Sequence, residues 1–98
     1  MTILVDDCRW AHRDHVWCHM VSDVSLQELH DFAETLGIPP RGFHGDHYDL
    51  PQYVRVKATQ LGAVEVTSKE LVRRLGAAGL RLTAAQRRAF KHEDPPST

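Results

Sequence analysis

The sequence contains only two cysteines, Cys8 and Cys18, and they lack the C-x-x-C spacing of a structural zinc site. No apolar run approaches the roughly 20 residues that a membrane span requires. A secretion signal begins with a basic segment followed by an apolar one, and the amino-terminal residues contain no such basic segment. Because the cytosol keeps thiols reduced, we expect a cytoplasmic protein with no membrane association and no structural disulfide.

An excess of charge of either sign is also absent, since 12 basic residues stand against 13 acidic ones and the net charge is −1. A chain with this balance has no overall field that attracts nucleic acid or an anionic membrane surface. The sequence lacks a glycine-rich phosphate loop, a G-x-S-x-G nucleophile elbow and an H-E-x-x-H zinc motif. We therefore expect neither bulk nucleic-acid binding nor a dinucleotide cofactor.

The 98 residues are 42% hydrophobic and 26% charged, which is the composition of a globular domain with a single modest core. From Lys91 onward the residues become polar, and Pro95-Pro96 blocks a helix. We interpret residues 1–90 as one domain and residues 91–98 as a flexible carboxyl-terminal tail.

Three short apolar segments have the composition of β-strands. Ile3–Val5 is a continuous apolar run, as in a strand that is buried on both faces. Val16–Val21 contains His19 as its only polar residue, and Ala63–Val66 is the third predicted strand. We interpret Cys8–His15, between the first two strands, as a polar loop.

Four helices are predicted from their first residues. Ser25, Thr67 and Thr83 are each followed three residues later by Glu or Gln, which is the capping-box pattern. The remaining helix is expected to begin with Asp49 as its N-cap and Pro51 in its first turn. This order of elements predicts a small single α/β domain with a short, mostly parallel sheet of about three strands flanked by helices.

The most chemically dense stretch is Phe43–Asp49, which holds two imidazoles, two carboxylates, a phenol and one glycine. Gly45 permits a backbone geometry that is closed to other residues, so the stretch suits a loop held by scaffold on both sides. Asp6, at the carboxyl end of the first strand, could face the same crevice, because ligands of such sheets bind beyond the strand ends. We place the functional site there.

Imidazoles and carboxylates together suit a divalent metal such as Mg²⁺, Mn²⁺ or Zn²⁺. The predicted ligands are Asp6, Asp46 and His47, and Asp49 is an alternative to Asp46 beside the histidines. Asp7 is a weaker candidate because adjacent strand residues point to opposite faces, and His44 is weaker than His47.

Each of these residues also has a purely structural interpretation. Asp49 can cap a helix, and His47 can be a solvated loop residue. His19, inside an apolar strand, can be a core histidine that donates to a carbonyl. If the first two strands pair, however, His19 stands beside the aspartates, and we include it among the candidate proton-transfer residues.

Several short motifs resemble those of a family of small bacterial and phage proteins catalogued only as a domain of unknown function. The matching pieces are Val5-Asp6-Asp7 with Trp10, Cys18-His19-Met20 followed by Asp23, Glu28-Leu29-His30, Gly45-Asp46-His47-Tyr48-Asp49 and Leu61-Gly62-Ala63-Val64. They cover residues 1 to about 75, and Gly-Asp-His-Tyr-Asp is the most specific of them. The resemblance implies a shared fold and a shared polar site, and it supplies no catalytic role.

The leading hypothesis is a metal-dependent hydrolase that acts on a phosphodiester or nucleotide. Its candidate catalytic residues are His47, Asp46 and His19, and its candidate substrate-binding residues are Arg9, Tyr48 and Lys57. The alternative is a non-catalytic module that binds a nucleotide or a partner protein through the same polar pocket. A small-molecule or nucleotide ligand is compatible with both hypotheses, and the oligomeric state is left open.

Overall fold

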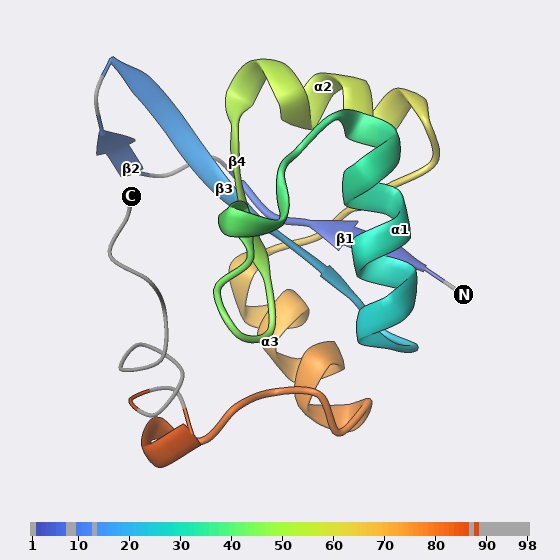
Figure 1. Ribbon diagram of the computed structural model, residues 1–98, viewed down its shortest axis with the longest axis vertical. Helices are drawn as coiled ribbons and strands as arrows, with labels where there is room; N and C mark the ends of the chain where they lie inside the picture. The colour runs from blue at the N-terminus through green and yellow to red at the C-terminus, as the bar shows by residue number, and fades with distance from the viewer. Residues whose placement is uncertain (1, 8–9, 13, 87, 89–98) are drawn as a thin grey trace.

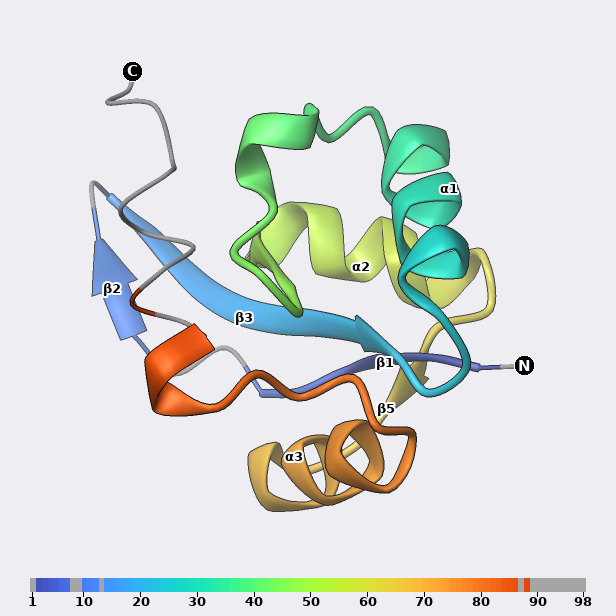
Figure 2. The ribbon, with the colours of Figure 1, turned by 60° about the horizontal axis from the view of Figure 1, so that its bottom comes forward.

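A mixed β-sheet runs through the middle of the structure, and helices cover both of its faces (Figures 1 and 2). The computed structural model describes residues 2–7, 10–12, 14–86 and 88. The strands are β1 (Ile3–Val5), β2 (Trp10–His12), β3 (His15–Ser22), β4 (Tyr48–Pro51) and β5 (Val64–Glu65). The helices are α1 (Leu26–Leu36), the short 3-10 helix η1 (Pro40–Gly42), α2 (Gln52–Gln60) and α3 (Ser68–Ala77). Figure 2 shows α1 and α2 on one face of the sheet and α3 on the other.

The long strand β3 organises the sheet, because β1, β2 and β4 all pair with it in antiparallel orientation. Among the described strands only β1 and β5 pair in parallel. The predicted α/β class is confirmed, whereas the prediction of a mostly parallel sheet is wrong, and the sheet has five strands rather than about three. The segment from Asp6 to Asp14 is too short for the helical crossover that parallel neighbours need, so β3 returns beside β1 in the opposite direction.

The core is divided by the sheet into two clusters of buried residues. The larger, on the side of α1 and α2, contains Ile3, Val5, Cys18, Met20, Leu29, Ala33, Leu36, Tyr48, Leu50, Ala58 and Ala63. The smaller, on the side of α3, contains Leu4, Val21, Leu71 and Leu75. Successive strand residues point to opposite faces, so β1 contributes to both clusters and is buried on both sides, as its apolar run predicted.

The N-cap predictions based on Ser25, Thr67 and Thr83 are confirmed, but the return bond of a capping box is not formed at Ser25, because its amide donates to the Ser22 hydroxyl. The Ser25 hydroxyl accepts from the amide of Glu28 at 3.0 Å, and the Thr67 hydroxyl accepts from the amide three residues later at 3.0 Å. Thr83 and Gln86 form a reciprocal capping box with distances of 3.1 and 2.8 Å. Gly37 ends α1 in the left-handed conformation, with φ of 79°. The tail from Lys91 lies outside the described residues, and its flexibility stays a prediction.

Two predicted boundaries are wrong. Asp49 does not cap α2, because Tyr48–Pro51 continues as β4 and the helix begins after Pro51 without a side-chain cap. The predicted loop Cys8–His15 contains β2 and the first residue of β3. Within the described part of the chain, no helix has the length and apolar character needed to cross a membrane.

Candidate metal centre

The register between β3 and β4 places His19 directly opposite Asp49. Tyr48 and Leu50 point into the larger core cluster, so Asp49 between them points to the other face of the sheet. His19 has the same orientation, because it lies between two core residues of β3. An imidazole and a carboxylate therefore stand side by side on the face that carries α3.

The loop before β4 adds Asp46 and His47 to this face. Gly45 has φ of 86°, the left-handed region that was predicted for it, and the amide of His44 donates to the carbonyl of His47 at 2.8 Å. The loop is therefore a tight turn that leads into β4. Asp46 is buried and 1% exposed, whereas the side chain of His47 is 18% exposed.

Asp6 holds the imidazole of His19 in place. One carboxylate oxygen, Oδ1, accepts from the His19 backbone amide at 2.7 Å, and Oδ2 lies 2.9 Å from His19 Nδ1. The Ser68 hydroxyl, in the first turn of α3, donates to the same Oδ2 at 2.8 Å. An ionised carboxylate only accepts, so Nδ1 of His19 carries a hydrogen, and Nε2 is the ring nitrogen that does not face Asp6.

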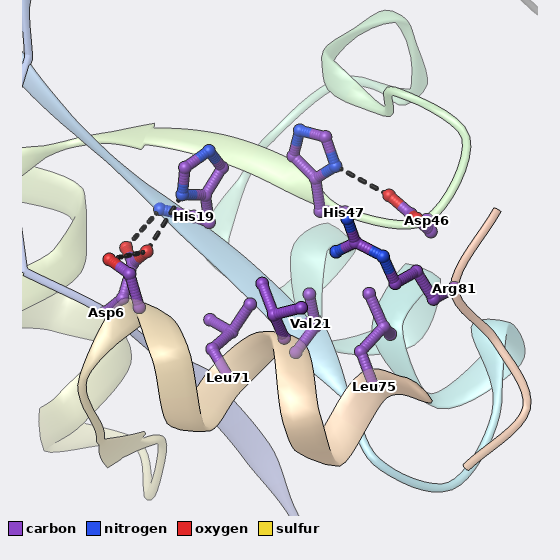
Figure 3. Close-up of a pocket in the computed structure, with 10 residues that line it drawn as sticks. Asp6, His19, Val21, Asp46, His47, Leu71, Leu75 and Arg81 are labelled. Atoms are coloured by element: carbon purple, nitrogen blue, oxygen red, sulfur yellow. Dashed lines mark hydrogen bonds and ion pairs between the residues drawn. The ribbon is translucent and has the colours of Figure 1, made fainter. Parts of the chain in front are cut away.

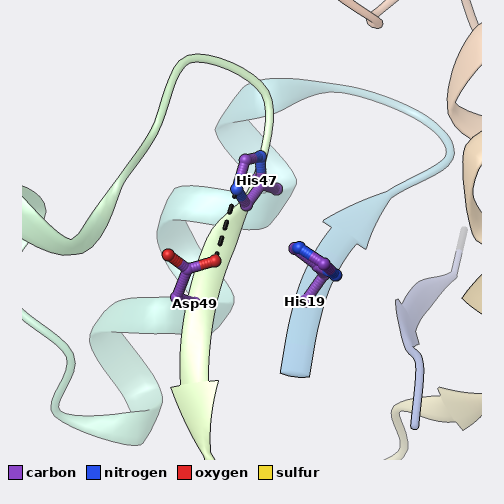
Figure 4. A group of neighbouring side chains, drawn as sticks. All are labelled: His19, His47 and Asp49. Atoms are coloured by element: carbon purple, nitrogen blue, oxygen red, sulfur yellow. Dashed lines mark ion pairs between the residues drawn. The ribbon is translucent and has the colours of Figure 1, made fainter. Parts of the chain in front are cut away.

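Asp46 holds His47 in the same way. Asp46 Oδ1 lies 2.8 Å from His47 Nδ1, and Asp46 Oδ2 accepts from the backbone amide of Leu82 at 3.0 Å. His47 Nε2 is then directed toward Asp49 (Figure 4). Histidines that bind metals commonly donate their second ring N–H to a carboxylate in this manner.

His19, His47 and Asp49 form a group that could hold a metal ion, since one ligand atom from each lies within 4.8 Å of the others (Figure 4). His47 Nε2 and Asp49 Oδ1 are 3.3 Å apart. Two ligands at the usual bond lengths around a tetrahedral zinc ion are also about 3.3 Å apart. His19 would have to approach by up to roughly 1.5 Å to reach that spacing.

Asp49 Oδ1 is buried, and it has no hydrogen-bond partner among the described residues. The 3.3 Å contact with His47 has the distance of an ion pair, but its geometry is not that of a hydrogen bond. The other oxygen, Oδ2, lies 3.3 Å from Nε2 of His44, which is 47% exposed. A buried oxygen without a hydrogen bond is rare in proteins, and a bound cation is one way to satisfy it.

The carboxylates control the protonation of the site. Burial alone would lower the pKa of His47, but the contacts with Asp46 and Asp49 outweigh it and raise this pKa to about 9. Burial alone would raise the pKa of Asp6, but the hydrogen bonds from His19 and Ser68 outweigh it, and the pKa of Asp6 falls below its ordinary value. In the absence of metal, His47 is therefore protonated at neutral pH and Asp6 is ionised.

A pocket of about 240 Å³ adjoins the two imidazoles (Figure 3). Its polar part is formed by Asp6, His19, Asp46, His47 and Ser68, and its remaining lining residues are Val21, Leu71, Val72, Leu75 and Arg81. Asp6 therefore shares one crevice with Asp46 and His47 of the Gly45–Asp49 cluster. The apolar wall contains Val21, Leu71 and Leu75 of the smaller core cluster, which come from β3 and α3.

The predicted site residues fall into distinct places. His47 belongs to the metal-capable group, whereas the predicted ligands Asp6 and Asp46 lie behind the histidines as hydrogen-bond acceptors. Tyr48, predicted to bind substrate, is 2% exposed, and its hydroxyl is 2.7 Å from His30 Nδ1. Burial raises the pKa of the Tyr48 phenol.

Of the two remaining predicted substrate-binding residues, Lys57 does not line the pocket. Lys57 is exposed on α2, on the face of the sheet opposite α3. Arg9 lies outside the described residues. The sequence offered Asp49 as an alternative ligand but favoured it as a helix cap, whereas Ser68 and Arg81 were not predicted as pocket residues. The alternation of apolar and polar residues in Tyr48-Asp49-Leu50 is the local signal that favours a strand over a helix start there.

Comparison of the chain with curated proteins and with solved structures gave no match. Among protein families, the one described as "Protein of unknown function (DUF4031)" matches residues 3–78. The matched segment contains every residue of the metal-capable group and both supporting aspartates, and it ends before Arg81. The resemblance seen in the sequence is therefore confirmed, and the chain belongs to the DUF4031 family of proteins of unknown function.

Proposed function

We propose that the domain binds a divalent transition-metal ion through His19, His47 and Asp49 and uses it to hydrolyse a phosphodiester or nucleotide. The observation that carries the proposal is the convergence of two imidazoles on the buried Asp49 oxygen that lacks a hydrogen bond. Each imidazole is also oriented by a carboxylate that is only 1% exposed. An isolated core histidine does not need such a partner, whereas a metal ligand does.

The charges of the site favour a cation. Asp6, Asp46 and Asp49 surround two imidazoles, and the first two are almost completely buried. Neighbouring carboxylates in a buried site repel one another unless positive charge compensates them. A divalent ion supplies that charge without requiring an extra proton on His47.

The donor set indicates which ions fit. Two imidazole nitrogens and one carboxylate oxygen suit zinc, manganese or iron, whereas magnesium prefers oxygen ligands and keeps most of its water. Three protein ligands leave coordination positions for water and substrate, as in catalytic zinc sites. We therefore expect Zn²⁺ or Mn²⁺ to bind more tightly than Mg²⁺.

When bound, such an ion lowers the pKa of a coordinated water and polarises a phosphoryl oxygen. The protein's own contribution is to fix the two imidazoles by their Nδ1 hydrogen bonds, so that Nε2 of each ring would be the atom offered to an ion. His44, exposed and in contact with Asp49 Oδ2, is the nearest group on the solvent side that could exchange a proton with bulk water.

Metal binding is tested on chelator-treated protein titrated with Zn²⁺, Mn²⁺ and Mg²⁺, with metal content measured by elemental analysis. His47→Ala, His19→Ala and Asp49→Asn should each weaken binding about 100-fold or more, because each removes a ligand. Asp6→Asn and Asp46→Asn should weaken it about 10- to 100-fold, because they only disturb orientation. His15→Ala and Asp31→Asn change exposed residues outside the group and should have no effect.

Hydrolysis is tested with bis(p-nitrophenyl) phosphate and with nucleotides, comparing the metal-loaded wild type with Asp49→Asn. Turnover that depends on added metal and is lost in Asp49→Asn supports the proposal. If the wild type binds no metal, or the ligand variants bind it as tightly as the wild type, the metal centre is rejected. Metal binding without turnover would instead favour the non-catalytic binding module.

A further inference from the structure

From its position in the pocket we infer that Arg81 forms an anion subsite beside the metal-capable group, so that the preferred ligand is a small phosphoester with an apolar substituent. This inference rests on the proposed function for the identity of the neighbouring metal. Arg81 lies in the segment after α3, just outside the residues matched by the family.

The position of Arg81 is fixed by its neighbours. The next residue, Leu82, donates its backbone amide to the buried carboxylate of Asp46, which ties the segment to the support of His47. Figure 3 shows the Arg81 side chain extending from this segment into the pocket, with its guanidinium group below the His47 ring. Arg81 has no hydrogen bond or ion pair with another described residue, so its donors are available to a ligand.

Among the charged residues that line the pocket, Arg81 is the one whose donors do not already face a carboxylate. Asp6 and Asp46 also line the pocket, but their oxygens already accept from His19, Ser68, His47 and Leu82. The guanidinium group presents several N–H donors in a plane and matches the oxygens of a phosphoryl group. A phosphoryl group at Arg81 would also lie close to His19 and His47, which line the same pocket.

The rest of the pocket defines the substituent of the ligand. Val21, Leu71 and Leu75 are buried and form one wall, and Val72, which is 40% exposed, extends it toward solvent. The volume of about 240 Å³ is below the roughly 300–1,000 Å³ of pockets for drug-sized ligands. It suits one phosphoryl group and a small apolar group, so any larger part of a substrate would remain outside.

The test uses phenylphosphonate, whose carbon–phosphorus bond resists hydrolysis, and inorganic phosphate, which has no apolar group. Binding to the metal-loaded full chain is measured by calorimetry, and the metal content of each sample is determined. Arg81→Gln should weaken phenylphosphonate binding about tenfold or more, with Arg81→Lys in between, because a charge-assisted contact is lost. Val72→Asn should weaken the binding of phenylphosphonate but not that of phosphate.

The matched control is Arg41→Gln, which removes the same charge from an exposed position that does not line the pocket. Equal affinities of wild type, Arg81→Gln and Arg41→Gln would overturn the inference, as would a wild type that does not bind phenylphosphonate at millimolar concentration. If the wild type holds no metal but phenylphosphonate binding still depends on Arg81, the proposed function fails and the anion subsite stands. Because metal content and phenylphosphonate binding are measured separately, loss of metal from both proteins is distinguished from loss of the subsite.

Discussion

Two neighbouring carboxylates set the pKa of His47. Its imidazole lies between Asp46 and Asp49, and the contacts with both raise its pKa to about 9. The ordinary pKa of histidine is near 6.5, so the folded protein holds this proton more tightly than the unfolded chain does. Stability in the metal-free state is therefore linked to pH through this residue.

For the metal-free protein we predict a loss of stability at alkaline pH. Because the folded-state pKa of His47 is raised, its contribution is complete below about pH 6.5 and disappears as the pH rises through about 9. The contribution should be on the order of 2 kcal/mol. Urea unfolding between pH 6 and pH 10 measures it as the difference between wild type and His47→Gln, and a difference that does not shrink with rising pH would contradict the pKa.

Gly45 is the second residue with a specific local role, because its φ of 86° is unfavourable for any residue with a Cβ atom. Gly45→Ala should lower the free energy of unfolding by about 1–2 kcal/mol and should also weaken metal binding, since the turn positions His47. The matched control is Gly76→Ala. Gly76 lies in α3 with nothing within 4 Å of an added Cβ, so this change should be neutral or stabilising. If Gly45→Ala changes neither stability nor metal binding, the turn does not need glycine.

At the scale of elements, the first turn of α3 links packing to the site. Leu71 and Leu75 pack on Leu4 and Val21, and the Ser68 hydroxyl donates to the carboxylate that holds His19. The helix is thus both a cover for one face of the sheet and a support for the candidate centre.

Removal of the α3 cap should therefore lower the stability of the fold. Thr67→Ala leaves the amide of Glu70 without its acceptor and should cost about 1 kcal/mol, or a fall in Tm of about 4–8 °C. Thr35→Ala, an exposed change inside α1, is the control and should have little effect because alanine is a good helix former. Calorimetric melting compares the two, and equal Tm values would show that α3 does not depend on its cap.

At the scale of the whole molecule, a metal ion would join parts of the chain that are distant in sequence. Its ligands come from β3, from β4 and from the loop before β4, and their supports come from the residue after β1 and from the turn at Asp46. An ion that binds only the folded arrangement stabilises the fold by mass action.

We predict that Zn²⁺ or Mn²⁺ at about 100 times its dissociation constant stabilises the protein by about 2.7 kcal/mol. For a domain of this size the corresponding rise in Tm is about 10 °C or more. His47→Ala should show no rise at the same metal concentration, which separates specific binding from general salt effects. An equal rise in wild type and His47→Ala would contradict the assignment of the centre.

The local features of this protein could be predicted from its residues, because the interactions behind these features span only a few positions. The caps at Ser25, Thr67 and Thr83 join residues three apart, and the two faces of β3 follow from alternation along one strand. The left-handed conformation of Gly45 and the family relationship were also evident from short motifs.

Only the tertiary structure decided which of the polar side chains meet and what each one contacts. Asp6 reaches His19 and Ser68 across 13 and 62 positions, and Asp46 reaches the amide of Leu82 across 36. Asp49 joins the metal-capable group and does not cap a helix because Tyr48–Pro51 pairs with β3 as a strand, although Asp49 and Pro51 favour a helix start when considered alone. Strand pairing depends on partners distant in the chain and on which face each core cluster covers, and no local pattern in the sequence contains that information.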